Sequence, residues 1–173
     1  MRPMLFFIGY MGAGKSHAAS RLASLTGRKA LDLDEVVEAS EGATAAQLFQ
    51  REGESAFRTA ELRALKDAVQ HNDVQIIACG GGTPIIPGAL EWMKSHGHVI
   101  HLNLSFEVIL SRLMDSQNKQ QRPLLYHADG TAKTAAELSA HWQSRMPHYA
   151  EAHEALTLAP EARDFQRWAK MLK

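Results

Sequence analysis

The feature that most constrains this chain is the glycine-rich segment at residues 9–16, which reads GYMGAGKS. It matches the pattern G-x-x-x-x-G-K-[ST] at every fixed position. The short apolar run at residues 4–8 predicts a buried strand before it, and residues 16–25 predict a helix after it, ended by Gly27. A glycine loop between a buried strand and a helix is typical of a phosphate-binding fold.

The residue types in this loop suit a nucleoside triphosphate. Glycines let successive backbone N–H groups turn inward around phosphate oxygens, and the start of the following helix adds partial positive charge. Lys15 offers a point charge to the β and γ phosphates, and the hydroxyl of Ser16 is placed for Mg²⁺. A chance glycine turn before a helix is the alternative, and the complete pattern in this context disfavours it. The loop leaves the acceptor open, since GTPases, ATPases and small-molecule kinases share it.

Strands and helices are predicted to alternate along the whole chain. The expected strands are residues 4–8, 30–33, 74–78, 98–104 and 155–158. The expected helices are residues 16–25, 34–72 with breaks near Gly42 and Gly53, 87–96, 106–114, 134–149 and 162–172. Residues 115–130 are polar without an apolar period, so a mobile loop is expected there. The alternation predicts a three-layer α/β fold, with ligands bound at the carboxyl ends of parallel strands.

Composition narrows the class of protein. The 173 residues fit one compact domain, and Lys plus Arg equals Asp plus Glu, so no global basic field indicates nucleic acid or an anionic membrane. The single cysteine, Cys79, favours a reducing compartment, and no segment approaches the length of a membrane span. The first apolar run is too short for a signal sequence. We therefore expect a cytoplasmic protein.

Two acids follow the second expected strand. Asp32 and Asp34 flank Leu33, and alternation in a strand would put both carboxylates on one side. One could support a metal ion while the other orients or deprotonates an acceptor hydroxyl. The alternative is that Asp34 caps the following helix.

Glu54, Arg58 and Glu61 have the spacing of one helical face. An exposed ion-pair ladder of little energetic value is one interpretation. The other is that the two acids fix the rotamer of Arg58, so that its planar fork can meet a substrate carboxylate.

Further candidates lie at the ends of later strands and in loops. Gly80, Gly81 and Gly82 end the strand at 74–78 and indicate either a close backbone approach to a ligand or a plain tight turn. The neighbouring Cys79 is expected to be a packed small residue. The nine histidines show no zinc-ligand spacing and are expected at the surface or in packing.

Two arginines complete the candidates. Arg122 lies in the polar loop and is placed to swing over phosphates on loop closure, unless it is simply solvated. Arg145 lies late in a helix, where a cation also favours the helix dipole.

Taken together, these residues resemble the shikimate kinase family. The resemblance spans residues 5–149 and follows one order along the chain. Its segments are residues 9–16, Asp32-Leu33-Asp34, Gly53-Glu54 with Phe57-Arg58 and Glu61, Gly80-Gly81-Gly82, Arg122-Pro123-Leu124-Leu125, and Arg145 with Pro147 and Tyr149.

The resemblance implies a P-loop kinase domain over residues 1–173. It implies five parallel strands, a substrate-binding subdomain at about 33–62 and a lid at about 115–130. It further implies transfer of the γ-phosphoryl group of ATP, with Mg²⁺, to the 3-hydroxyl of shikimate, a step in chorismate and aromatic amino-acid biosynthesis. A monomer acting on this small molecule is expected, with no nucleic-acid or membrane partner.

The resemblance also implies a role for each matching residue. Gly12, Ala13, Gly14, Lys15, Ser16 and His17 would bind the nucleotide, with Arg122 as the lid arginine. Ser16 would ligate Mg²⁺, and Asp32 would support it through water. Asp34, Arg58, Gly81 and Arg145 would bind shikimate, the two arginines at its carboxylate, beside an apolar wall of Phe49 and Phe57. The catalytic residues would be Asp34, Lys15 and Arg122.

The sequence departs from the family pattern at His17, in the Gln-rich start of the lid and at residues 157–160. Arg112 is the one candidate for stacking on adenine. Two alternatives remain at this stage. One is a related small-molecule kinase acting on gluconate or a nucleoside monophosphate, and the other is a noncatalytic nucleotide-binding protein.

Overall fold

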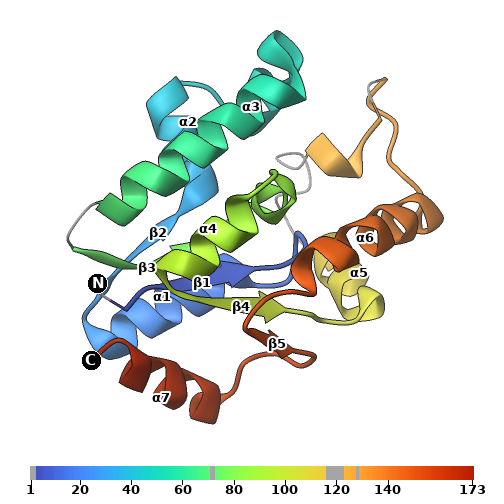
Figure 1. Cartoon of the computed structure of the whole chain (residues 1–173). Helices are drawn as coiled ribbons and strands as arrows, with labels where there is room; N and C mark the ends of the chain where they lie inside the picture. The colour runs from blue at the N-terminus through green and yellow to red at the C-terminus, as the bar shows by residue number, and fades with distance from the viewer. Residues whose placement is uncertain (1–2, 71–72, 116–122, 128) are drawn as a thin grey trace.

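The computed structural model describes residues 3–70, 73–115, 123–127 and 129–173. Within this part of the chain, five parallel strands form one sheet in the order β2-β3-β1-β4-β5. Figure 1 shows helices above and below this sheet. The predicted three-layer α/β fold with a five-stranded parallel sheet is confirmed.

The bounds of the elements follow the predicted pattern closely. The strands are β1 (Leu5–Ile8), β2 (Lys29–Asp32), β3 (Val74–Ala78), β4 (His98–Leu102) and β5 (Glu154–Leu156). The helices are α1 (Lys15–Thr26), α2 (Leu33–Glu41), α3 (Ala45–Gln70), α4 (Ala89–His96), α5 (Phe106–Asp115), α6 (Ala135–Tyr149) and α7 (Ala162–Met171). Single 3-10 turns lie at Thr83–Ile85 and Pro123–Leu125.

The central strand β1 is buried on both faces, as a strand in a parallel sheet must be. Leu5 and Phe7 pack on one face with residues of α1 and α7, including Trp168. Phe6 and Ile8 pack on the other face with residues of α2, α3, α4 and α6. The phosphate loop leaves β1 at its carboxyl end, between these two cores.

A third apolar cluster supports the loop from the side of α5 and α6. Tyr10 packs there with Ile109 and Leu113 of α5, Leu138 of α6, and Leu125. Tyr10 is 2% exposed, so the second residue of the glycine loop belongs to the core.

The segment predicted as a lid is more anchored than its polar composition indicated. Leu125 is buried in the third cluster, and Tyr126 forms an antiparallel bridge with Ala132. The expected loop at 115–130 therefore contains a fixed apolar contact. Residues 116–122 and 128 lie outside the described residues, and so does Arg122.

The two predicted helix breaks are present. Gly42 ends α2 in a left-handed conformation, and Gly53 interrupts α3 with φ 82° and ψ 172°. The prediction for Asp34 was wrong in two respects. Strand β2 ends at Asp32, so Asp34 lies in the first turn of α2, and the Oδ1 of Asp32 caps this helix by accepting from the N–H of Asp34 at 3.1 Å. The capping role therefore belongs to Asp32, and strand alternation does not relate the two carboxylates.

No helix in the described residues is long and apolar enough to cross a bilayer.

Candidate active site

The phosphate loop is held in shape by its own residues and by α5. Gly14 has φ 96°, a backbone conformation that residues with a Cβ rarely adopt. The Nζ of Lys15 donates to the carbonyl oxygen of Tyr10 at 3.1 Å, across the mouth of the loop. The Nη1 of Arg112 donates to the carbonyl oxygens of Gly12 and Ala13 at 3.3 and 3.1 Å. In this arrangement the Arg112 guanidinium braces the loop, a contact the sequence did not predict.

The first polar pair of the site joins the loop helix to the end of β2. The Ser16 hydroxyl donates to the Oδ2 of Asp32. Both side chains offer hard oxygen atoms, the donor type that Mg²⁺ prefers. Among the described residues, no three His, Cys, Asp or Glu side chains gather as metal ligands. This pair therefore suits an ion that takes most of its ligands from phosphates and water.

Asp34 carries the most informative carboxylate. Loss of hydration at the crowded base of the site raises its pKa from 3.8 to about 6, even though part of the residue remains open to solvent. The positive charge of Lys15 opposes this rise, and the nearby negative charges of Glu61, Asp32 and Glu38 reinforce it. A carboxyl group with a pKa near neutrality and a lysine of the phosphate loop beside it can both orient a hydroxyl and accept a proton.

Arg58 is fixed by the two acids predicted to hold it. Its Nε and Nη2 donate to the Oε1 of Glu54 at 3.3 and 3.1 Å, and its Nη1 donates to the Oε2 of Glu61 at 2.7 Å. Glu61 is fully buried and also accepts from the hydroxyl of Thr83 at 2.5 Å. The exposed-ladder interpretation was therefore wrong for Glu61, because this side of the pair lies in the core.

The glycine turn after β3 is the meeting point of these groups. A Cβ at Gly80 would lie against the Oε1 of Glu61 and 2.6 Å from the Oδ1 of Asp34. A Cβ at Gly82 would overlap the guanidinium of Arg58. Side chains on this turn would displace the carboxylates and the arginine, so the turn serves a close approach rather than simple chain reversal.

The middle glycine joins the phosphate loop to α6. A Cβ at Gly81 would lie 3.6 Å from the carbonyl oxygen of Gly9 and 3.7 Å from the N of Met11. The Tyr149 hydroxyl donates to the carbonyl oxygen of Gly81 at 2.6 Å. Burial raises the pKa of Tyr149, and the charges of Arg145 and Arg58 both act to lower it. The charges of two arginines on different helices, α3 and α6, therefore both act on this tyrosine.

Arg145 has a partner that was not predicted from the sequence. Its Nε and Nη2 lie 3.2 and 3.1 Å from the Nε2 of His141, one turn earlier on α6. The Nδ1 of His141 lies 2.7 Å from the hydroxyl oxygen of Tyr10. The i, i+4 spacing of His141 and Arg145 was the one local signal for this pair, whereas the contact with Tyr10 joins distant parts of the sequence and had no such signal.

An aromatic pair lies beside Arg58. The rings of Phe49 and Phe57 have centroids 4.7 Å apart. The Cζ of Arg58 lies 5.7 and 5.3 Å from their centroids. This arrangement brings together the residues expected to form an apolar wall and stabilises the cation above them.

Two further residues singled out in the sequence, His17 and Cys79, lie outside the contacts described above. His17 is exposed at the start of α1. Cys79 is buried, its pKa is raised by that burial, and its Sγ lies 3.6 Å from the Sδ of Met93, so the expected packing role is confirmed.

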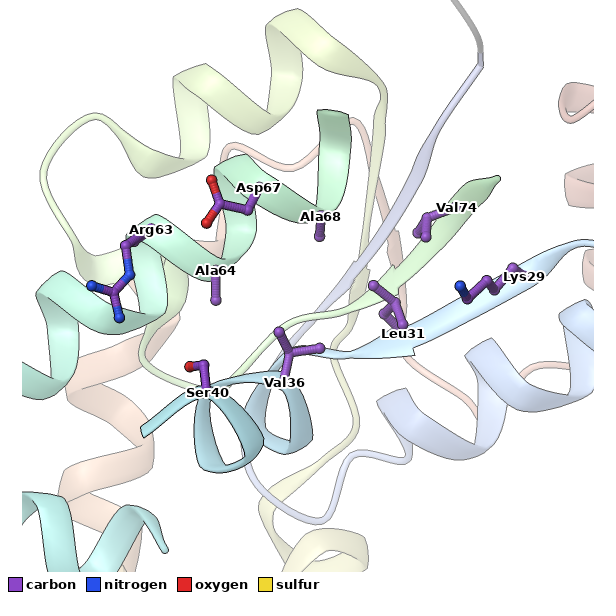
Figure 2. Close-up of a pocket in the computed structure, with 9 residues that line it drawn as sticks. All are labelled: Lys29, Leu31, Val36, Ser40, Arg63, Ala64, Asp67, Ala68 and Val74. Carbon is purple, nitrogen blue, oxygen red and sulfur yellow. The ribbon is translucent and has the colours of Figure 1, made fainter. Parts of the chain in front are cut away.

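A cavity of about 370 Å³ lies away from this constellation. Figure 2 shows it between α2, α3 and the strands β2 and β3, with Lys29 and Val74 at its border. Lys29 opens β2 and Val74 opens β3, so the cavity is at the amino ends of these strands. Ligands of parallel sheets bind at the carboxyl ends, where the phosphate loop, Asp34 and Gly81 are.

A phosphate loop facing a carboxylate and two arginines defines a P-loop kinase that acts on small molecules. The family model described as shikimate kinase matches residues 11–173. This chain belongs to the shikimate kinase family. A shikimate kinase of Chromobacterium violaceum is 37% identical over 146 residues, which cover 84% of this chain and 75% of the relative.

Solved structures agree with this assignment. The shikimate kinase of Acinetobacter baumannii in complex with shikimate has a TM-score of 0.81 at 30% identity, over 98% of this chain and 90% of that one. A gluconokinase of Sinorhizobium meliloti has a TM-score of 0.52 at 14% identity, over 99% of this chain and 91% of that one. The second similarity shows the fold alone.

Proposed function

We propose that this protein transfers the γ-phosphoryl group of ATP to the 3-hydroxyl of shikimate. The observation that carries the proposal is the convergence of Asp34, Arg58 and the phosphate loop on the turn at Gly80, Gly81 and Gly82. The proximity of these groups to one turn supports a site in which Asp34 would bind the acceptor hydroxyl, Arg58 its carboxylate and the loop the phosphates. The family assignment selects shikimate among hydroxy acids of that size.

The carboxylate of shikimate would bind between Arg58 and Arg145. A guanidinium can present parallel N–H groups to both oxygens of a carboxylate. The contacts of Arg58 with Glu54 and Glu61 hold its plane in one orientation, and Phe49 and Phe57 close the apolar side of the ring. The backbone of Gly81 would add a contact at the floor of the site.

The hydroxyl of shikimate would face Asp34. The Asp34 carboxylate accepts a hydrogen bond from this hydroxyl and fixes the hydroxyl oxygen in line with the γ-phosphorus. As the O–P bond forms, the proton has an acceptor whose pKa lies near the working pH. A loose transition state needs little deprotonation in advance, so orientation alone is the alternative role for Asp34.

Stabilisation of the phosphoryl group falls to the loop and the lid. Lys15 would contact the phosphates, with backbone N–H groups of Gly12, Ala13, Gly14, Ser16 and His17 around them. Ser16 and Asp32, the latter through water, would hold Mg²⁺, which when bound neutralises charge on the β and γ phosphates. Arg122 would reach the γ-phosphate when the lid closes.

We also propose roles for two segments of the chain, an oligomeric state and a place for the reaction in metabolism. Residues 33–62 would act as a substrate-binding subdomain and residues 115–130 as a lid. The acting unit would be a monomer. The product would enter chorismate and aromatic amino-acid biosynthesis in the cytoplasm, a compartment that suits a single unpaired cysteine.

A panel of acceptors tests the proposed function. ADP release is measured with shikimate, gluconate, each nucleoside monophosphate and no acceptor, using the wild-type protein and Lys15→Ala as the inactive control. We expect ADP release only when shikimate is the acceptor. Mass spectrometry and ³¹P NMR should then detect shikimate 3-phosphate. Release with gluconate or a nucleotide in place of shikimate would overturn the substrate, and the absence of any release would overturn the activity.

A further inference from the structure

His141 connects the phosphate loop to Arg145. Its Nδ1 lies 2.7 Å from the hydroxyl oxygen of Tyr10, and its Nε2 receives the Nε and Nη2 of Arg145 at 3.2 and 3.1 Å. The rings of Tyr10 and His141 also lie against each other, with centroids 5.5 Å apart. The imidazole therefore makes three polar contacts with two fixed partners.

The donors settle which nitrogen of His141 carries the proton. A guanidinium has N–H donors and no acceptor, so Nε2 must present its lone pair to Arg145. A neutral imidazole then carries its proton on Nδ1, which donates to the oxygen of Tyr10. Only the neutral, Nδ1-protonated form of His141 satisfies both sides.

The contact uses one particular edge of Arg145. Nε and Nη2 form the side-on edge of a guanidinium, and the Nη1 and Nη2 groups also carry N–H donors on the end-on edge. Arg58 follows the same arrangement, because its Nε and Nη2 both reach the Oε1 of Glu54. Both arginines are thus held by the side-on edge. In Arg58 the Nη1 group also donates to Glu61, whereas the contacts of Arg145 with His141 use only its Nε and Nη2, so Arg145 can offer its end-on edge to a carboxylate.

The two arginines differ in the charge of the partner. Glu54 and Glu61 place negative charge beside Arg58, whereas the partner that holds Arg145 is a neutral imidazole. The charged groups around His141 are Arg145 on its own helix, Lys133 before that helix and Glu54 on α3, with the neutral hydroxyl of Tyr10. Burial and the two cations lower the pKa of His141, and Glu54 opposes them, so the neutral form is kept at neutral pH.

We propose that His141 is a positioning residue for the acceptor. His141 is anchored to the buried Tyr10 and holds the side-on edge of Arg145, so that the end-on edge of Arg145 faces the substrate carboxylate. This inference rests on the proposed function of the site. His141 touches neither substrate in this arrangement and acts through Arg145.

The first test compares His141→Leu with His141→Gln. Leucine removes both polar contacts. Glutamine keeps an oxygen for Arg145 and an N–H for Tyr10, and it does not titrate. We expect His141→Leu to raise the KM for shikimate about tenfold, the loss typical of one charge-assisted hydrogen bond. We expect little change in kcat or in the KM for ATP, and recovery in His141→Gln to within about threefold of wild type.

A second arm separates positioning from general support of the fold. If His141 acts through Arg145, then His141→Leu has no further effect on the KM for shikimate in an Arg145→Ala background. An undiminished effect in that background would overturn the inference. If His141→Leu does not fold, Tyr10→Phe takes its place, because it removes the hydroxyl and keeps the buried ring.

The last arm reads the protonation state directly. Imidazole ¹⁵N NMR of the wild-type protein at neutral pH should show His141 protonated on Nδ1 only. On acidification, Nε2 gains a proton that faces Arg145, so the ratio of the wild-type KM for shikimate to that of His141→Gln should rise. The ratio cancels the titration of Asp34, which both proteins share.

The outcomes distinguish this inference from the proposed function. A wild-type protein that phosphorylates shikimate, together with an unchanged KM in His141→Leu, overturns the role of His141 alone. An Nε2-protonated or charged imidazole at neutral pH overturns it as well. Lack of turnover with shikimate overturns the proposed function, and the role of His141 with it.

Discussion

The carboxylate of Glu61 accepts from the Nη1 of Arg58 at 2.7 Å while being completely shielded from solvent. The hydroxyl of Thr83 donates to the other oxygen of the same carboxylate. The ion pair is therefore part of the core beneath the acceptor site, and α3 is connected through it to the turn that follows β3.

We predict that Glu61→Ala destabilises the protein much more than Glu54→Ala, although both acids bind Arg58. Breaking a buried ion pair leaves its partner poorly compensated and costs about 3 kcal/mol, the lower end of the usual range because Arg58 is 18% exposed. The Glu54 side chain is 61% exposed, so its loss should cost less than about 1 kcal/mol. Urea unfolding measures both, and equal losses would contradict the buried character of the Glu61 contact.

Arg58→Lys and Arg145→Lys are each expected to weaken shikimate binding about tenfold or more, because a lysine cannot make a two-pronged contact. ATP binding should change little. Isothermal titration with shikimate and with ATP measures both affinities. Arg63→Lys is the matched control for Arg58→Lys, since Arg63 lies on the same helix α3, has an exposed side chain and pairs with Glu41. Normal shikimate affinity in both site variants would mean that the carboxylate binds elsewhere.

Asp34 should set the acid limb of the activity profile. With a pKa of about 6, its carboxylate is lost as the pH falls, so kcat/KM for shikimate should decline below that pH. Asp34→Asn should lower turnover roughly a hundredfold or more at every pH, the usual worth of general base catalysis. Glu35→Gln, at the exposed next position, is the control. Wild-type turnover in Asp34→Asn would eliminate the base role.

The raised pKa of Asp34 should also make the stability of the protein depend on pH. The folded pKa of Asp34 lies above the ordinary 3.8, so the folded state binds this proton more tightly than the unfolded state does. Its contribution to stability is complete below pH 3.8 and is lost as the pH rises through about 6. Relative to wild type, Asp34→Asn should therefore gain stability between acid and neutral pH, measured by urea unfolding at several pH values. A constant difference across that window would contradict the raised pKa.

Arg122→Ala is expected to lower kcat more than it weakens shikimate binding, since this arginine is proposed to act on charge that develops in the transition state. Hydrogen exchange of residues 115–130 should slow when a nonhydrolysable ATP analogue and shikimate bind together. Leu125 provides a reference within the segment, because its burial predicts protection without ligand. Exchange unaffected by both ligands would contradict lid closure.

Much of the site followed from the sequence because its contacts are local. The phosphate loop is one continuous segment, and Arg58 lies one helical turn from each of its acids. The rule that ligands bind at the carboxyl ends of parallel strands also pointed to the segments after β2 and β3 as parts of the site. These inferences needed only the periods of helices and strands.

The errors and omissions arose where tertiary contacts decide the outcome. Asp34 was predicted as a strand residue or a helix cap, whereas Asp32 caps α2 and moves the helix start back to Leu33. His141 was one of nine histidines without a metal-binding spacing, and its role depends on Tyr10 at the far end of the chain. The apolar anchor at Leu125 was hidden in a polar segment because its partners come from α5 and α6.

The strand order has a consequence for folding during synthesis on the ribosome. Strand β1 is made first, yet its neighbours in the sheet are β3 and β4. Its apolar residues must therefore remain without a partner strand until β3 has been synthesised, and β1 has both neighbours only after β4, beyond the middle of the chain. Arg112 of α5, which braces the glycine loop after β1, is made later still. The nascent chain should thus be unable to bind nucleotide during most of its translation, and should be a client for chaperones that shield apolar segments.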